Sequence, residues 1–351
     1  MTLQPETVAD SRFKAIELWF EQQKPLIARQ LGWAELGHGT FASASSDASF
    51  RRYFRWSSAD LSLILMDAPP EHENCQTFVC IAELLASAGV HVPKILAHDY
   101  EQGFLVLTDL GRQTWLEYWL ADERHRENPE LFFQRALNTL LRIQQIDLAT
   151  VTIPSYDEAL LRRELELFPS WYVTKELGCE FNEQQQAWWD LSCQKLIDSA
   201  LAQEQVFVHR DYMPRNLMLS EPNPAVIDFQ DAVKGPVTYD TICLFKDAFI
   251  SWDEALVARC LRDYWQKAQT LGVPVAADYD SFRQDYDWMG VQRHLKVIGI
   301  FARICHRDGK PRYLSDVARF FTYIEQVLQR YPELSELQQL LNSLPRKDAA
   351  V

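Results

Sequence analysis

One stretch of the chain, residues 206–228, restricts the possible folds more than any other. It begins with a short apolar run and continues into a polar loop, His209-Arg-Asp-Tyr-Met-Pro-Arg-Asn216. A second apolar run ends at Asp228. Short apolar runs bounded by polar and turn-forming residues are typical of strands. The stretch therefore predicts a strand, a loop rich in polar side chains, and a further strand that ends at a carboxylate.

The residues between Asn216 and Asp228 predict a hairpin. Residues 217–219 and 225–227 are apolar and read as its two strands. The segment between them, Glu221-Pro-Asn-Pro224, is rich in turn-forming residues. Because the two strands of a hairpin have neighbouring ends, we expect the side chains of Asn216 and Asp228 to lie side by side.

The polar loop resembles the catalytic loop of protein kinases. Residues 209–216 match its pattern His-Arg-Asp-x-x-x-x-Asn at every fixed position. The resemblance implies that Asp211 orients an acceptor hydroxyl and receives its proton. It also implies that Asn216 and Asp228 hold Mg²⁺ beside the phosphates of ATP. His209 would have a structural role in the loop.

The sequence after Asp228 departs from protein kinases, because it lacks both the Asp-Phe-Gly glycine and an Ala-Pro-Glu signature. It reads Asp-Phe-Gln-Asp-Ala-Val-Lys-Gly-Pro and ends in Tyr239-Asp240, which resembles the aminoglycoside phosphotransferase and choline kinase branch of the kinase-like fold. These are small-molecule kinases, and the resemblance implies that Asp240 is structural and braces the catalytic loop. It also implies an α+β, bilobal protein-kinase-like fold, with a small β-rich N-terminal lobe and a large helical C-terminal lobe.

Three further segments resemble a narrower group, the bacterial kinases that phosphorylate N-acetylmuramate and N-acetylglucosamine at the anomeric 1-hydroxyl in peptidoglycan recycling. They are Ser46–Arg55, Leu65–Pro70 and Trp288–Arg303. The resemblance covers nearly the whole chain and implies an ATP-dependent sugar kinase whose product is an α-1-phosphate. Two alternatives stay open. One is a phosphotransferase for an aminoglycoside or an amino alcohol such as choline, and the other is a nucleotide-binding regulator without catalytic activity.

We expect a nucleotide-binding lobe at residues 1–108, a hinge at 109–111 and a helical lobe at 112–351. Hinge backbone groups bind adenine in this fold, so Asp109 and Leu110 are the expected contacts. In the first lobe, the sequence pattern predicts two hairpins, at 50–56 with 61–66 and at 93–98 with 103–108. It also predicts a leading helix within 11–31, broken by Pro25, and a second helix at 73–88. In the second lobe it predicts helices at 114–121, 129–146, 157–168, 182–202, 239–249, 252–270, 278–305, 312–330 and 333–343.

The segment expected to cover the ATP phosphates lacks the Gly-x-Gly-x-x-Gly pattern of protein kinases. Residues 43–49 are small and polar instead. Their backbone N–H groups and hydroxyls, including those of Ser46 and Ser49, could face phosphate oxygens. An ordinary solvated turn is the alternative.

Met66 stands where a kinase strand would supply a phosphate-binding Lys. We expect Arg51 or Arg52 on the neighbouring strand to replace it. Successive strand residues face opposite sides, so only one of the two can point toward the nucleotide, and the resemblance favours Arg52. Glu83 lies where the first-lobe helix of this fold presents a Glu to that Lys. It would pair with an Arg or remain a surface charge.

The segment Trp288–Arg303 is the expected wall of the acceptor site. On a helix, Lys296 shares a face with Gln292 and with Arg293. Basic side chains there could bind the carboxylate of N-acetylmuramate, and Arg does so with two parallel hydrogen bonds. Ordinary surface cations are the alternative. Arg215 in the catalytic loop is a further candidate for contact with the acceptor.

Charge, cysteine content and hydrophobic pattern indicate in which compartment the protein works and which partners are excluded. The formal charge of −14 argues against a general nucleic-acid-binding protein, which would carry a basic surface. Seven scattered cysteines without Cys-x-x-Cys spacing suggest reduced thiols. The sequence shows no signal-peptide pattern and no run of about 18 apolar residues, the length of a membrane-spanning helix. We therefore expect a cytoplasmic protein. The resemblance implies ATP and a small amino sugar as its partners, and we expect a monomer.

Overall fold

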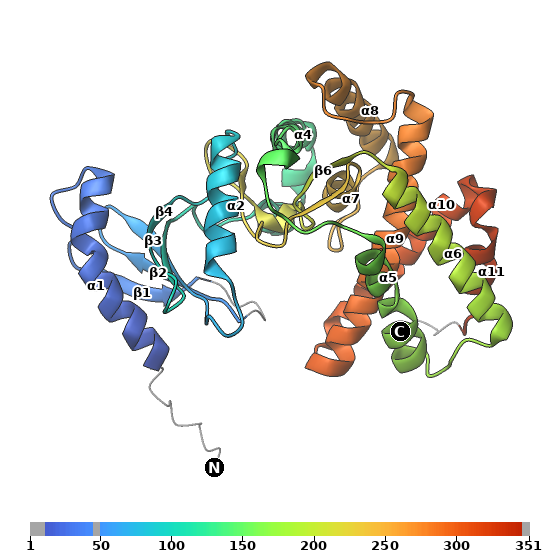
Figure 1. The fold of residues 1–351 in the computed structure, drawn as a ribbon, viewed down its shortest axis with the longest axis horizontal. Coiled ribbons are helices and arrows are strands. Elements are labelled where there is room, and N and C mark those ends of the chain that lie inside the picture. The colour runs from blue at the N-terminus through green and yellow to red at the C-terminus, as the bar shows by residue number, and fades with distance from the viewer. Residues whose placement is uncertain (1–10, 45–49, 346–351) are drawn as a thin grey trace, which may run out of the picture. The chain divides into compact units, whose positions relative to one another are not determined.

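The computed structural model describes residues 11–44 and 50–345, which form two compact units. One unit contains the chain up to Thr114 together with Met218–Gln230, and the other contains Trp115–Leu217 and the chain from Asp231 onward. A small antiparallel sheet lies in the first unit and helices dominate the second, as expected for the α+β class (Figure 1). The lobe boundaries at 108 and 112 stay a prediction. The segment that contains Asp228 belongs to the first unit, although it follows the catalytic loop in sequence.

The first unit is built on a five-stranded antiparallel sheet with the order β1-β2-β3-β5-β4. Both predicted hairpins are present, since β2 pairs with β3 and β4 pairs with β5. The first strand, β1, was not predicted, because its four residues are too few to show an alternation. The strands are β1 (Thr40–Ser43), β2 (Arg52–Ser57), β3 (Ser62–Asp67), β4 (Ile95–Asp99) and β5 (Phe104–Thr108).

One helix, α1 (Ser11–Leu31), covers a face of this sheet (Figure 1). It continues through Pro25, where the sequence predicted a break. Its buried Ile16, Trp19 and Phe20 share an apolar core with strand residues that include Trp56, Leu63, Leu65 and Phe104. The second helix of the unit is α2 (Cys75–Ser87), which begins where the side chain of Asn74 accepts a hydrogen bond from the backbone N–H of Thr77 at 3.1 Å. This cap satisfies a backbone donor that a helix start leaves unpaired.

Gly103 closes the turn before β5. Its φ is +73°, a backbone conformation that side chains other than glycine rarely adopt. A Cβ atom there would lie 1.9 Å from the carbonyl oxygen of Ala68. In return, the N–H of Ala68 donates to the carbonyl of Gly103 at 2.8 Å, which fixes the end of β3.

The predicted hairpin after the catalytic loop is present. Its strands are β7 (Leu217–Met218) and β8 (Ala225–Val226), which pair with each other. Backbone hydrogen bonds hold this hairpin in the first unit, from the N–H of Leu219 to Gln113 at 2.9 Å and from the N–H of Val226 to His91 at 2.8 Å.

Each of the nine predicted ranges of the second unit contains a helix. The helices are α3 (Trp115–Ala121), α4 (Glu130–Gln144), α5 (Glu158–Leu165), α6 (Glu183–Ala202), α7 (Tyr239–Phe245), α8 (Glu254–Leu271), α9 (Tyr279–Asp308), α10 (Val317–Arg330) and α11 (Ser335–Ser343). A two-stranded sheet of β6 (Gln205–Val208) and β9 (Val233–Pro236) leads into the catalytic loop. A π-helix at Phe168–Glu176 was not predicted, because its hydrogen-bond spacing leaves no mark in a 3.6-residue pattern.

The long helix α9 is central to this unit (Figure 1), where it packs against α5, α6, α7, α8, α10 and the π-helix. It begins at the side-chain cap of Asp278 and ends at Gly309, whose φ of 66° is typical of a helix C-terminus. No helix in the described part of the chain is long and apolar enough to cross a membrane.

Candidate active site

Asp240 holds the His-Arg-Asp loop through hydrogen bonds to its backbone. This fully buried carboxylate accepts hydrogen bonds from the backbone N–H of His209 at 2.7 Å and of Arg210 at 3.0 Å. Arg210 has a φ of 74°, which is uncommon for a residue other than glycine and costs conformational energy. Asp240 was predicted to brace this loop, and its two contacts stabilise the backbone directly before Asp211.

Burial and hydrogen bonding act on Asp240 in opposite directions. Burial raises the pKa of its carboxyl to about 7, while the two backbone N–H donors lower it. The protein interior therefore penalises the charged form of Asp240, and the two hydrogen bonds compensate for part of that penalty.

Asp211 is half-buried, and Asn216 turns its side chain back onto the same loop. The amide nitrogen of Asn216 donates to the backbone carbonyl of Asp211 at 2.9 Å. The Nδ1 atom of His209 accepts a hydrogen bond from the backbone N–H of Asp211 at 3.3 Å. Arg215 places its guanidinium 5.8 Å from the ring centre of Phe249. The loop thus brings together the predicted base and one of the two predicted metal ligands.

The predicted acceptor wall on α9 is buried. Gln292 and Arg293 are inaccessible, and Arg293 donates to the backbone carbonyl of Lys246 at 3.3 Å. Lys296 forms an ion pair with Glu164 at 2.8 Å and donates to the hydroxyl of Tyr239 at 3.0 Å. Through Glu164, Lys296 is connected to Arg210 of the loop, whereas Arg293 contacts the end of α7. Their predicted contact with an acceptor stays a prediction.

Glu164, which no motif in the sequence marks, is the main side chain that sequence reasoning missed. Its carboxylate lies 2.7 Å from Nη2 of Arg210 as well as 2.8 Å from Nζ of Lys296. It also accepts a hydrogen bond from the hydroxyl of Tyr156. Burial raises the pKa of Glu164, but the two cations outweigh it and hold that pKa below its ordinary value.

In the first unit, Asp228 follows β8 with a φ of 63° and a solvent-exposed side chain. Its Oδ1 accepts a hydrogen bond from the side-chain amide of Gln230 at 2.8 Å. Tyr53 on β2 lies within electrostatic reach of Asp228, Arg51 and Glu73, and its burial is the main cause of its raised pKa. Arg51 and Asp228 therefore belong to one cluster.

The two candidate arginines have different partners. Arg51 pairs with Glu73 at 2.5 Å, directly before α2. Arg52 instead donates from Nε to the fully buried carboxylate of Asp67 at 3.0 Å, which Arg12 also contacts at 2.9 Å. Arg51 thus lies in the cluster with Asp228, whereas Arg52 pairs with Asp67. Which of the two contacts phosphate stays a prediction.

Three further predicted positions can be placed on the first unit. Met66 is fully buried in β3, and Glu83 is exposed on α2. Asp109 in the predicted hinge accepts from Arg55 Nε at 2.6 Å, from the Ser62 hydroxyl, and from the N–H of Gly111 at 3.0 Å. Burial raises the pKa of Asp109, yet the hydrogen bonds from Arg55 and Ser62 bring it below its ordinary value.

Leu110 joins a small apolar cluster with Met218 and Ala225 in the same unit. Both residues of the predicted hinge thus have partners within the first unit, since the side chain of Asp109 pairs with Arg55. Ser46 and Ser49 lie outside the described residues.

Asn216 in the helical unit and Asp228 in the first unit each carry an oxygen suited to Mg²⁺. The side-chain amide nitrogen of Asn216 donates a hydrogen bond to the backbone carbonyl of Asp211. The side-chain oxygen of Asn216 is therefore the atom suited to bind a metal. Asp228 supplies an exposed carboxylate. Residues 11–44 and 50–345 contain no group of three or more His, Cys, Asp or Glu side chains that could hold a metal ion. Each of these oxygens is of the kind that Mg²⁺ binds, and this metal commonly takes its other ligands from waters and substrate phosphates. Their joint role as metal ligands stays a prediction.

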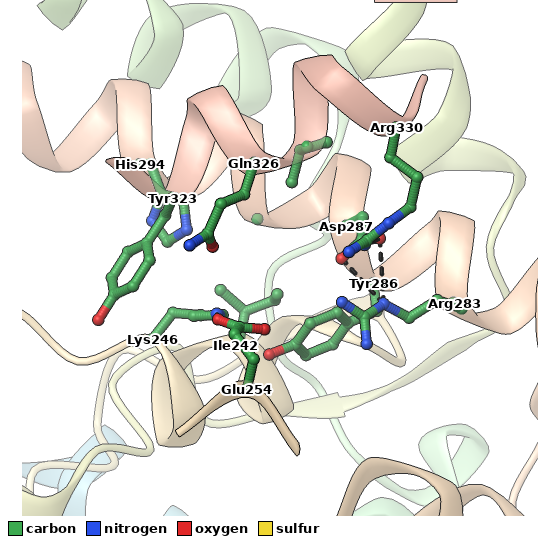
Figure 2. Close-up of a pocket in the computed structure, with 12 residues that line it drawn as sticks. Ile242, Lys246, Glu254, Arg283, Tyr286, Asp287, His294, Tyr323, Gln326 and Arg330 are labelled. Atoms are coloured by element: carbon green, nitrogen blue, oxygen red, sulfur yellow. Dashed lines mark hydrogen bonds and ion pairs between the residues drawn. The ribbon is translucent and has the colours of Figure 1, made fainter. Parts of the chain in front are cut away.

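A pocket in the helical unit is lined from the end of α7 and from α8, α9 and α10 (Figure 2). Its charged side chains neutralise one another. Lys246 and Glu254 form an ion pair, and Asp287 lies between Arg283 and Arg330 and accepts hydrogen bonds from both. The pocket is thus on a different face of α9 from Lys296, which contacts Glu164.

Fold and site together define the class of the protein. A small antiparallel sheet, a helical unit and a His-Arg-Asp loop followed by a strand-end Asp are the features of a kinase-like phosphotransferase. Residues 40–283 match the model of the phosphotransferase enzyme family. The chain belongs to this family and is a kinase.

Known relatives extend over nearly the whole chain. The N-acetylmuramate/N-acetylglucosamine kinase of Pseudomonas aeruginosa is 56% identical over 96% of this chain and 98% of its own length. The enzyme of the same name from Pseudomonas putida is 58% identical over 95% of this chain and 97% of its own length. The enzyme of that name from Neisseria meningitidis is 43% identical over 87% of this chain and 90% of its own.

Solved structures agree on the fold. Choline kinase LicA from Streptococcus pneumoniae matches with a TM-score of 0.58 at 14% identity, over 90% of this chain and 100% of that one. ADP-bound aminoglycoside phosphotransferase APH(2'')-Ib matches with a TM-score of 0.56 at 12% identity, over 91% of this chain and 99% of that one. At such low identity they support the kinase-like fold alone.

Proposed function

We propose that this protein transfers the γ-phosphoryl group of ATP to the anomeric hydroxyl of N-acetylmuramate and N-acetylglucosamine, giving the α-1-phosphate and ADP. The observation that carries the proposal is the 56–58% identity, over 95–96% of the chain, to two enzymes named for these sugars. The sequence retains Asp211, Asn216 and Asp228, the residues that phosphoryl transfer requires. Such an activity would serve the recycling of peptidoglycan sugars.

In the reaction, Asp211 accepts a hydrogen bond from the acceptor hydroxyl and takes its proton as the oxygen attacks phosphorus. Asn216 and Asp228 would hold Mg²⁺, which neutralises charge on the phosphates when bound. Arg51 supplies a cation in the cluster that contains Asp228. Arg215, in the same loop as Asp211, is our candidate for contact with the sugar.

The test is ADP release with Mg-ATP and a panel of acceptors, namely N-acetylmuramate, N-acetylglucosamine, glucose, choline and kanamycin. Phosphorus NMR of the product then identifies the phosphorylated position. We expect turnover of the two N-acetyl sugars and a sugar 1-phosphate signal. Turnover of choline or kanamycin alone would overturn the substrate, and a phosphate at another hydroxyl would overturn the anomeric position. ATP binding without turnover would favour a regulator.

A further inference from the structure

Glu164 lies near the end of α5, outside the catalytic motifs, yet it contacts the loop that carries Asp211. Only 6% of its side chain is exposed, and its carboxylate pairs with Arg210 Nη2 at 2.7 Å and with Lys296 Nζ at 2.8 Å. Arg210 also lies over the ring of Tyr156, and the hydroxyl of Tyr156 donates a hydrogen bond to Glu164. The four side chains form one buried cluster, which we call the Glu164 cluster.

The position of Arg210 makes this contact consequential. Arg210 directly precedes Asp211 and has a left-handed backbone with a φ of 74°. Such a conformation persists only where surrounding contacts hold it. Asp240 holds the backbone of Arg210 through its N–H at 3.0 Å, and Glu164 holds its side chain. Both the backbone and the side chain of Arg210, the residue before the proposed base, are therefore held by buried carboxylates.

Lys296 connects the same cluster to the Asp240 contact. Its ammonium group donates to the hydroxyl of Tyr239, which is the neighbour of Asp240 at the start of α7. One carboxylate thus joins the catalytic loop, α5 and α9, and α9 reaches α7 through Lys296. A buried ion pair of this kind is a weak source of stability, because each charge pays for its loss of water. Its better-attested use is to specify one geometry.

We propose that Glu164 is a positioning residue, which holds Arg210 so that the carboxylate of Asp211 faces the acceptor hydroxyl. The inference rests on the proposed role of Asp211 as the base in phosphoryl transfer. It does not depend on which sugar is the acceptor. Misplacing a reacting group by about 1 Å can cost roughly 10²-fold in rate. Loss of the Glu164–Arg210 contact should therefore lower kcat, and it should leave the KM values for ATP and acceptor nearly unchanged.

The primary variant is Glu164→Gln, which keeps the shape and removes the charge. We expect kcat to fall between about tenfold and 10²-fold, with both KM values and the Kd for ATP within about threefold of wild type. The matched control is Glu158→Gln on the same helix, which removes an exposed ion pair with Arg162 at 3.1 Å and should leave kcat unchanged.

Glu164→Gln leaves two half-buried cations without a counter-charge and could fail to fold, so Arg210→Gln tests the contact from the other side. In that variant Glu164 keeps Lys296 and Tyr156 as partners. We expect a similar fall in kcat with a thermal midpoint close to wild type. Where both single variants fold, the double variant should be no slower than the worse single variant, because both changes remove one contact.

Two results would overturn the proposal. One is a kcat for Arg210→Gln within twofold of wild type. The other is a loss confined to KM or to thermal stability in both variants. The measurements use whichever acceptor the wild-type enzyme phosphorylates fastest. Failure of the sugar assignment would therefore appear in the wild-type panel, whereas failure of the positioning role would appear only in the comparison of variants.

Discussion

Asp240 reaches back across 31 positions of sequence to accept the backbone N–H of His209 at 2.7 Å. A second N–H, that of Arg210, is bound by the other oxygen of the same carboxylate at 3.0 Å. The loop that carries Asp211 is therefore fixed by a residue whose own charge is costly to bury. A catalytic carboxylate on such a loop is held in place before substrate binds, which lowers the reorganisation needed during the reaction.

The first prediction concerns Asp211. We expect Asp211→Asn to lower kcat by at least ~10²-fold, because the amide cannot accept the proton of the acceptor hydroxyl. Folding and ATP binding should stay near normal, since the described contacts of Asp211 with His209 and Asn216 use its backbone. Steady-state ADP release measures the effect, and Asp60→Asn on an exposed turn is the control. Activity within tenfold of wild type would remove Asp211 as the base.

The second prediction separates Arg51 from Arg52. Arg51 shares a cluster with Asp228, so Arg51→Met should raise the KM for ATP roughly tenfold or more, in line with about 1.5–3 kcal/mol for a hydrogen bond to a charged group. Arg52→Met should act mainly on stability, because it leaves the buried Asp67 with Arg12 as its charged partner. ATP titrations and thermal unfolding of both variants decide the matter. A larger change in KM for Arg52→Met would instead favour Arg52, the residue expected from the sequence.

Much of the site was predictable because its signals are local. The His-Arg-Asp loop, the hairpin that follows and the two sheet hairpins each depend on residues within a short stretch, and the structure contains all of these elements. The choice between Arg51 and Arg52 depends on residues that are distant in the sequence. Strand alternation indicates that they face opposite sides, but only the positions of Glu73 and Asp67 show which side each one faces.

The role of Glu164 could not be predicted for a related reason. It lies 46 positions from Arg210 and on a different helix from Lys296. A Glu on an amphipathic helix ordinarily faces solvent. Glu164 instead shares a helix face with Leu161 and Phe168, and this placement within an apolar stripe is a local signal of burial that the sequence analysis did not use. Likewise, Gln292 and Lys296 were correctly placed on one face of a helix, but that face turns inward to Glu164.

A third prediction follows from the buried His294. Burial, assisted by Arg293 and Lys246, lowers the pKa of His294 well below its ordinary value, so the folded protein keeps it neutral. The unfolded chain takes up a proton below about pH 6.5, so stability is full above that pH and falls as the pH drops further, by up to about 1.4 kcal/mol per unit for this group. Urea unfolding at several pH values should show this slope reduced in His294→Gln and unchanged in His38→Gln, at an exposed site. Identical slopes in all three proteins would contradict it.

The last prediction tests the close packing of α9 against the end of α5, which brings Lys296 near Glu164. Gly299, less than one turn further along α9, lies against the chain between α5 and the π-helix, where an added Cβ would be 2.3 Å from the carbonyl carbon of Leu167. Backbone cannot yield as a flexible side chain can, so Gly299→Ala should destabilise the protein by about 1–3 kcal/mol, even though Ala is the better helix former.

Gly290→Ala on the same helix is the matched control for Gly299→Ala. A Cβ at Gly290 would meet the Cδ1 atom of Ile242 at 3.1 Å, the end of a flexible side chain that can move aside. We therefore expect its cost to stay below about 1 kcal/mol, because the gain in helix propensity offsets the contact. Urea unfolding of the two variants compares them directly. Equal stability losses would mean that the close approach of α9 to Leu167 is not what limits this position.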